Sequence, residues 1–117
     1  MEEYKGKTVI GLLEEITIYS NNGKRKTLMA KIDTGATKSS IDINLASKLK
    51  LGPVIKSRMI KSAHGSKLRP VIEAHVKLAG KKMLSEFTLI DRAHMKYKAL
   101  IGQATLKNGF IIDPSKE

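Results

Sequence analysis

The sequence predicts an all-β protein with one or two short helices. Three observations support this fold class: β-branched and aliphatic residues occur in short runs, turn-forming Gly, Asn and Pro recur between the runs, and only two short stretches have a helical pattern. The chain has 117 residues, of which 41% are hydrophobic, which is enough for one apolar core and too little for two. Residues 1–117 are therefore expected to form a single domain.

A predicted β-hairpin opens the chain. Residues 8–20 read T-V-I-G-L-L-E-E-I-T-I-Y-S, which is rich in β-branched residues and partly alternating. Asn21-Asn22-Gly23 then supplies residues that tolerate the positive φ angles of a tight turn. The return strand, residues 27–32, runs directly into Asp33-Thr34-Gly35-Ala36, where strand residues give way to turn residues. This motif therefore sits where a strand becomes a loop.

The rest of the chain is predicted as short strands and two helices. Asp42 or Asn44 can cap the first helix, and Gly52-Pro53 ends it. A long hairpin has its turn at His64-Gly65-Ser66. Only the first few residues and residues 114–117 are expected to be loose. The predicted strands are residues 39–41, 56–63, 68–78, 82–90, 99–102 and 110–113, and the second helix is residues 103–107.

Composition bears on the compartment and the partners. The chain has no cysteine, so a disulfide framework or a thiolate metal site is impossible, and a cytoplasmic location is the expectation. The charged start and the lack of a long apolar stretch predict a soluble protein with no membrane partner. The net charge of +11 favours an acidic or polyanionic partner. Only 4% of residues are aromatic, and they are not interleaved with Lys and Arg in the way that a base-stacking platform needs, so nucleic acid is the weaker candidate partner.

Asp33-Thr34-Gly35 is the motif that carries chemistry. Aspartic proteases need two carboxylates about 3 Å apart that share one proton, so that one activates a water while the other protonates the scissile carbonyl. Glycine allows the tight turn that such a loop needs, and the threonine hydroxyl can bond across to a second loop. The chain has one D-T-G sequence, which is half of such a site. The same tripeptide is also an ordinary surface turn.

The order of segments from Met29 to Leu106 resembles that of retropepsin-like aspartic proteases. Apolar residues precede D-T-G-A, a strand and a short helix follow it, and Ala99-Leu100-Ile101-Gly102 later leads into a second helix. The resemblance implies an acid protease barrel with half an active site per chain, and therefore a homodimer. It also implies the roles of individual residues. These are Asp33 as the catalytic residue, Thr34, Gly35 and Ala36 as loop support, Leu100, Ile101 and Gly102 packed behind the loop, and Ala63, His64, Gly65 and Ser66 in a substrate-binding flap.

Residues 31–37 (K-I-D-T-G-A-T), 62–71 (S-A-H-G-S-K-L-R-P-V) and 98–113 narrow the resemblance further. They look like the small microbial retropepsin-like group labelled "ATP-dependent zinc protease", which is associated with ATP-grasp ligases that add amino acids to carboxylates. The zinc in that label has no support in this sequence. His64, His75 and His94 match neither H-E-x-x-H nor a close pair on one face, so neither a metal nor another cofactor is expected.

The sequence departs from the retropepsin pattern at two positions. Many relatives have a carboxylate directly after D-T-G-A and an Arg directly after L-I-G, whereas this chain has Thr37 and Gln103 there. Both members of the usual ion pair are neutral, so a hydrogen bond is expected to replace the salt bridge without leaving one charge buried alone.

Other acidic and hydroxyl residues are weaker candidates for catalysis. Asp91 reads as part of a turn and Asp113 as a strand end, and neither precedes Thr-Gly. Ser39 and Ser40 lack a G-x-S-x-G elbow and are expected to serve in packing and loop hydrogen bonds.

A group of cations with no acid among them marks the predicted flap strands. They form either a solvated basic face or a field that favours acidic, Glu-rich peptides, and the sequence leaves both interpretations open. These cations are Lys56, Arg58, Lys61, Lys67 and Arg69.

Together these features predict a homodimeric aspartic endopeptidase in which water, activated by Asp33 of each chain, is the nucleophile. The first alternative is a non-catalytic dimeric module that binds a peptide or RNA on the same fold. A weaker alternative is a nucleic-acid-binding β-barrel.

Overall fold

The structure is a computed structural model that describes residues 2–116. The all-β prediction with two short helices is confirmed within that range. The helices have six and four residues, so no helix of the described chain could span a membrane. The strands are β1 (Glu3–Tyr4), β2 (Lys7–Ile10), β3 (Leu13–Tyr19), β4 (Arg25–Ile32), β5 (Ser39–Asp42), β6 (Lys56–Ser62), β7 (Gly65–Leu78), β8 (Lys81–Ile90), β9 (Ala99–Ile101) and β10 (Phe110–Ile112), and the helices are α1 (Ile43–Lys48) and α2 (Gln103–Leu106).

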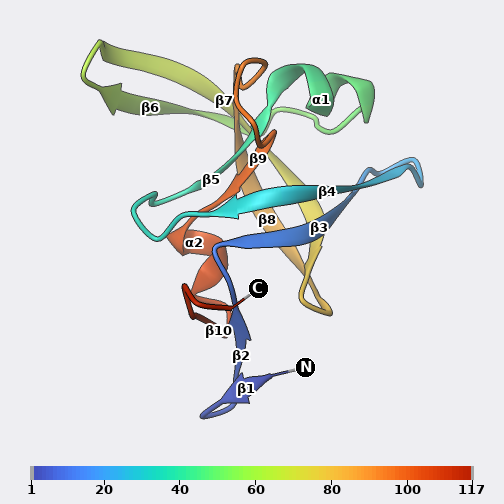
Figure 1. The fold of residues 1–117 in the computed structure, drawn as a ribbon. Helices are drawn as coiled ribbons and strands as arrows, with labels where there is room; N and C mark the ends of the chain where they lie inside the picture. Colours follow the sequence, from blue (N-terminus) through green and yellow to red (C-terminus); the bar gives the residue numbers. More distant parts are fainter. Residues whose placement is uncertain (1, 117) are drawn as a thin grey trace.

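Six of the strands close into a barrel. The order β3-β4-β9-β5-β8-β7 is completed by pairing between β3 and β7, and β6 extends the sheet beyond β7 (Figure 1). Two of the pairings, β4 with β9 and β5 with β8, are parallel. The parallel pairings bring the end of β4 next to the end of β9, although the two strands lie far apart in the sequence.

Alternating side chains fill the barrel. In β3, Ile16 and Ile18 are buried, while Thr17 between them is only half-buried. Val76 and Leu78 of β7 pair opposite these residues, so the inward faces of the two strands meet. Period-two burial of this kind is what one apolar face of a strand requires. The largest fully buried side chain is Phe87 of β8.

The predicted strand over residues 8–20 is two strands in the structure, and that part of the prediction is wrong. Its path breaks at Gly11-Leu12, between β2 and β3. The Gly11 N–H donates to Glu14 Oε2 at 2.7 Å, and a Cβ on Gly11 would lie 2.6 Å from the Lys116 carbonyl oxygen. Glycine therefore allows the C-terminal segment to pack at the break.

Beyond this break, the chain ends form a small second sheet. β2 pairs with β1 and, in parallel, with β10, and Figure 1 shows this sheet at the end of the barrel where both termini lie. Lys116 Nζ donates to the Val9 carbonyl at 2.6 Å. The expectation of loose ends is therefore wrong for Glu3–Tyr4 and for Lys116, because both are bonded to β2.

Asp42 caps α1 and also ties it to a distant loop. Its Oδ2 accepts from the Leu45 N–H at 3.2 Å, which selects Asp42 over Asn44 as the cap. Its Oδ1 accepts from the Arg92 N–H at 2.8 Å. Asp42 is only 4% exposed, so both bonds are largely shielded from water. The helix packs Ala46 on the core and ends with Leu49 as its C-cap.

We predict that Asp42→Ala lowers the free energy of unfolding by about 2–4 kcal/mol, because it removes a helix cap and leaves a buried N–H without its acceptor. Asp91→Ala is the matched control. Asp91 accepts from the Ala93 N–H in an exposed turn, so this change should cost less than about 1 kcal/mol. Urea unfolding of both variants measures the difference, and equal costs would contradict the burial argument.

Candidate active site

Asp33 lies directly after β4, at the start of a loop over residues 33–38 (the Asp33 loop). Its N–H donates to the Ile101 carbonyl of β9 at 2.9 Å, which extends the β4–β9 ladder by one residue. The Gly35 N–H donates to Asp33 Oδ1 at 2.9 Å, and the Ala36 N–H donates to the Asp33 carbonyl at 3.2 Å. These bonds fix one carboxylate oxygen. The other oxygen, Oδ2, has no hydrogen-bond partner within residues 2–116.

The start of α2 supports this loop from behind. The Gln103 N–H donates to the Ala36 carbonyl at 2.8 Å, and the Ala104 N–H donates to the Thr37 carbonyl at 3.0 Å. Helix N-termini carry unsatisfied N–H groups, and here two of them serve the loop. A Cβ on Gly102 would lie 2.4 Å from the Lys38 carbonyl oxygen and 2.8 Å from that of Ala36. No side chain fits at residue 102, so the loop and the β9–α2 junction are in close contact.

Gln103 stands where many relatives have an arginine. Its side chain binds Thr34 and not Thr37, the partner that the sequence suggests. Its Nε2 donates to the Thr34 carbonyl at 2.6 Å, and Thr37 is bound through its backbone instead. A hydrogen bond does replace the salt bridge, but it joins the Gln103 side chain to the backbone at the centre of D-T-G and not to Thr37. The side chains of Thr37 and Gln103 have no bond to each other among the described residues.

A chain of three hydroxyls lies under the loop. Thr105 Oγ1 is 2.6 Å from Ser39 Oγ and 2.8 Å from Ser85 Oγ, and Ser39 Oγ accepts from the Gly102 N–H at 3.1 Å. All three hydroxyl residues are buried. The expectation that Ser39 serves in loop hydrogen bonds is confirmed, whereas sequence reasoning missed Ser85 and Thr105.

The flap hairpin consists of β6 and the first part of β7. Its register pairs Lys56 with Val71 and Ser62 with Gly65, so the chain turns at Ala63-His64. The four residues assigned to the flap tip therefore lie at the turn. Figure 1 shows this hairpin and the loop between β4 and β5 projecting on the same side of the barrel.

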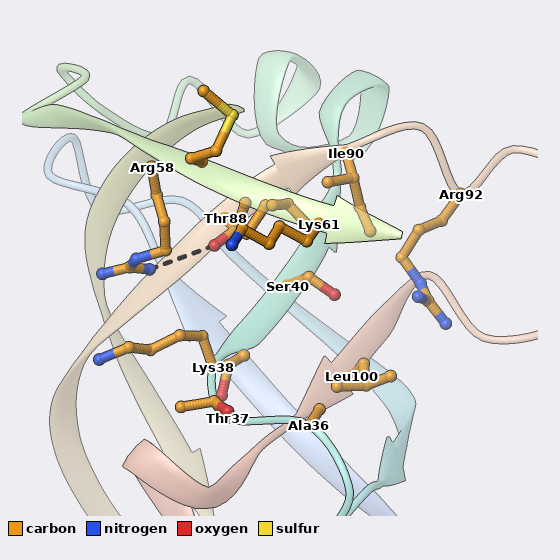
Figure 2. Close-up of a pocket in the computed structure, with 13 residues that line it drawn as sticks. Ala36, Thr37, Lys38, Ser40, Arg58, Lys61, Thr88, Ile90, Arg92 and Leu100 are labelled. Atoms are coloured by element: carbon orange, nitrogen blue, oxygen red, sulfur yellow. Dashed lines mark hydrogen bonds between the residues drawn. The ribbon is translucent and has the colours of Figure 1, made fainter. Parts of the chain in front are cut away.

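A pocket of about 590 Å³ lies between the Asp33 loop and the flap hairpin. Residues 36–40 form one wall and residues 58–61 of β6 form another, so it is the strand and not the flap tip that covers the loop within one chain. Four cationic side chains line the pocket, and Figure 2 shows how they are distributed. They are Lys38, Arg58, Lys61 and Arg92.

Glu86 neutralises part of the basic flap. Its carboxylate lies 2.9 Å from Lys56 Nζ and 2.7 Å from an Arg58 guanidinium nitrogen. Hydrogen bonds from Lys56 and then Arg58 lower the pKa of Glu86, so this group is ionised at neutral pH. The sequence placed no acid among the flap cations, and the structure corrects this, because β8 brings Glu86 beside β6 through β7.

The three histidines lie on different parts of the chain, and all three are exposed. His75 points outward from β7 and is exposed, as expected, and His94 lies in an exposed loop. Within residues 2–116 no group of three or more His, Asp or Glu side chains is arranged to bind a metal ion.

With this geometry in view, comparisons with known proteins decide the family. Residues 43–117, more than half of the chain, match the family model described as RimB-like, retropepsin-like aspartic endopeptidase RimB. The chain belongs to this family. The description of the family is that of an aspartic-type endopeptidase. The matched residues begin after the Asp33 loop, so the family match does not include Asp33.

Solved structures share the fold. The protein Lpg0085 of unknown function from Legionella pneumophila superposes with a TM-score of 0.67 at 20% identity, over 93% of this chain and 95% of that one. The EIAV protease with the inhibitor HBY-793 gives 0.65 at 16% identity, over 92% of each chain. The simian foamy virus protease gives 0.59 at 22% identity, over 81% of this chain and 91% of that one. These likenesses establish the retropepsin fold.

A curated relative is much longer than this chain. A probable alpha-L-glutamate ligase from Shewanella pealeana is 38% identical over 64 residues, which are 54% of this chain and 14% of the ligase. The chain therefore corresponds to a small part of that protein.

We predict that Gly102→Ala lowers the free energy of unfolding by at least about 3 kcal/mol or prevents folding, because the new methyl group would overlap backbone carbonyls that cannot move independently. Gly23→Ala is the control. Gly23 has a φ of +86° and no heavy atom within 4 Å of its Cβ position, so only about 1–2 kcal/mol of conformational strain is expected. Thermal unfolding of the two variants tests this, and a mild effect at Gly102 would contradict the close contact.

Proposed function

We propose that the protein is a homodimeric endopeptidase in which Asp33 of each chain forms the catalytic dyad. The observation that carries the proposal is the Asp33 loop itself. Bonds from Gly35 and Ile101 fix the Asp33 backbone and one carboxylate oxygen, while Oδ2 has no partner within residues 2–116. A second carboxylate must complete the site, and a two-fold axis supplies it, because an isologous contact places equivalent residues opposite each other.

The chemistry follows from two carboxylates that share one proton. The ionised carboxylate takes a proton from water as the water oxygen attacks the scissile carbonyl carbon, and the protonated carboxylate donates its proton to the carbonyl oxygen. The tetrahedral intermediate then collapses: the carboxylate that is now ionised takes a proton from one hydroxyl of the intermediate, the C–N bond breaks, and the amide nitrogen leaves with a proton from the other carboxyl group, so the dyad again holds one proton. No covalent bond to the enzyme forms at any stage.

We predict that Asp33→Asn folds normally but loses hydrolysis by at least roughly 10²- to 10⁴-fold, the range for positioned acid–base groups. The asparagine oxygen can still accept from the Gly35 N–H, so the loop should keep its shape. Asp91→Asn, in an exposed turn, is the control and should retain full activity.

Cleavage at the wild-type rate by purified Asp33→Asn would rule out the aspartic mechanism. If the wild-type protein binds peptides without cleaving them, the non-catalytic module is favoured instead.

The loop also suggests how the dimer is stabilised. Thr34 is exposed, its carbonyl is bound by Gln103, and its hydroxyl has no partner within the described chain. A hydroxyl at this position can bond to the equivalent loop across the two-fold axis. Thr34 would then connect the two halves of the site.

We predict that the protein sediments as a dimer at micromolar concentrations and that Thr34→Ala raises the dissociation constant of the dimer. Thr37→Ala is a matched control, because Thr37 is also exposed and is fixed through its backbone carbonyl. The reason for the expected difference is the loss of a hydrogen bond at the subunit interface, worth about 0.5–1.5 kcal/mol, or roughly 2- to 10-fold. A fully active monomer would contradict the half-site argument.

An acidic, Glu-rich peptide is the proposed substrate class. Lys56 and Arg58 are paired with Glu86, but Lys61, Lys67 and Arg69 have no ion pair among the described residues. The positive field over the pocket is therefore smaller than the sequence suggested, and its sign is unchanged. The similarity to part of a probable alpha-L-glutamate ligase supports the same class, because a peptidase linked to such an activity would meet glutamate-rich chains.

We predict that the double charge reversal Lys61→Glu with Arg69→Glu lowers kcat/KM for a Glu-rich peptide more than for its Gln-substituted counterpart. Exposed charges contribute about 0–1 kcal/mol per pair, so the combined selective effect should be roughly 2- to 10-fold and should fade as salt is raised. Lys24→Glu with Lys26→Glu makes the same change in net charge at the β3–β4 turn, away from the flap hairpin (Figure 1), and should have little effect. Equal losses for both peptides would mean that the flap cations are a solvated surface.

We also propose a cytoplasmic location, which the absence of cysteine supports.

A further inference from the structure

Arg92 is a buried arginine at the edge of the pocket. It is only 5% exposed. Its backbone N–H donates to Asp42 Oδ1 at 2.8 Å, and its Nε–H donates to the Tyr97 carbonyl at 2.9 Å. One bond fixes the backbone of Arg92 and the other fixes its Nε atom, so the loop after β8 sets the direction in which the guanidinium points.

The two terminal nitrogens of this guanidinium have no hydrogen-bond or ion-pair partner within residues 2–116. Burial lowers the pKa of Arg92, while the negative charges of Asp42 and Asp33 raise it, but neither carboxylate approaches within ion-pair distance. A guanidinium has five N–H donors in a planar fork. Among the described residues, no side-chain nitrogen or oxygen is both buried and without a hydrogen-bond partner, so the terminal nitrogens of Arg92 have some access to solvent and their donors are available to a ligand.

Arg58 provides a contrast at the other end of the same pocket (Figure 2). Its terminal nitrogens donate to Glu86 Oε1 at 2.7 Å and to Thr88 Oγ1 at 3.3 Å. Arg58 therefore has partners within the chain for its terminal nitrogens, whereas the terminal nitrogens of Arg92 have none within residues 2–116. Of the two, Arg92 is the one near Asp33.

Two pockets meet at Arg92. It lines the pocket of about 590 Å³ together with Ala36, and a second pocket of about 350 Å³ together with Ile32. Ile32 and Ala36 bracket Asp33 in the sequence. Arg92 therefore lines both spaces beside the residues that flank Asp33 in the sequence, although Asp33 itself lines neither pocket.

We propose that Arg92 determines specificity by binding a side-chain carboxylate of the peptide substrate close to the scissile bond. This inference rests on the proposed function, and it names the group that binds the acidic residue of the substrate. The planar fork matches a carboxylate in a two-bond contact, which a lysine cannot reproduce. Since each subunit of the dimer contributes one Arg92, one acidic side chain is recognised on each side of the cleaved bond.

The first experiment uses the wild-type protein and a Glu-rich peptide in which each Glu in turn is replaced by Gln. We expect one position on each side of the cleavage site at which the change lowers kcat/KM by roughly 10- to 100-fold, the size of a charge-assisted hydrogen-bonded contact. The loss at these positions should change little with salt, because a buried pair is screened less than an exposed one. Small, equal and salt-sensitive losses at every position would overturn the proposal.

The second experiment repeats the scan with Arg92→Met and Arg92→Lys. Arg92→Met should remove the Glu-over-Gln preference at the sensitive positions alone, mainly through KM, and Arg92→Lys should retain part of it. Lys77→Met is the control, because it removes one charge from an exposed position on β7 that lines neither pocket and should leave the scan unchanged. If Arg92→Met fails to fold, the peptide scans of Arg92→Lys and of the wild-type protein test the proposal.

Three results would separate the possible failures. A Glu-over-Gln preference that survives in a folded Arg92 variant overturns this inference and leaves the proposed function intact. A weaker dimer with an unchanged preference assigns the guanidinium to the subunit interface and also overturns it. No cleavage of any peptide by the wild-type dimer overturns the proposed function, and this inference with it.

Discussion

The close approach of Gly102 to the Asp33 loop is the contact on which the half-site depends. Because residue 102 has no side chain, the carbonyls of Ala36 and Lys38 can lie against it, and the first N–H groups of α2 then reach the carbonyls of Ala36 and Thr37. The same approach brings the Gly102 N–H within reach of Ser39 Oγ. The loop is fixed by short backbone bonds to a buried junction, which suits a carboxylate that must keep its position during a reaction.

The barrel explains why that junction lies where it does. Because β4 and β9 pair in parallel, their C-terminal ends lie side by side. Asp33 and Gly102, which follow these two ends, are therefore neighbours. The buried hydroxyls of Ser39, Ser85 and Thr105 satisfy one another beneath the loop. Polar groups in a core are costly unless they are bonded, and a fully bonded group of this kind favours one arrangement of the elements around it. Support for the loop is thus supplied within one chain, whereas the proposed dyad needs a second chain.

Local sequence patterns predicted most of the strands, both helices and the turn of the flap hairpin, because alternation and turn residues act over a few positions. The features that were missed depend on contacts between distant segments. The break at Gly11 requires the packing of Lys116, and the pairing of Glu86 with Arg58 requires three adjacent strands. Ser85 was within reach of sequence reasoning, because it alternates with Met83 and Phe87 on the inward face of β8. Arg92 was not, since it lies in a loop without periodicity and only the fold buries it.

The distribution of charge along the pocket follows from the same topology. β8 supplies Glu86 at the end where Arg58 lies, and this carboxylate cancels charge that β6 would otherwise present. Within residues 2–116 no carboxylate comes within ion-pair distance of Arg92 at the other end, although the charges of Asp42 and Asp33 act on its pKa. A uniform basic surface would attract any polyanion. A pocket in which one arginine is ion-paired and the other is not attracts negative charge to one end more than to the other. For the extended peptide that we propose as the substrate, this asymmetry would favour a negative side chain next to the cleaved bond over one further along, and the two-fold axis of the proposed dimer would repeat that preference on the other side.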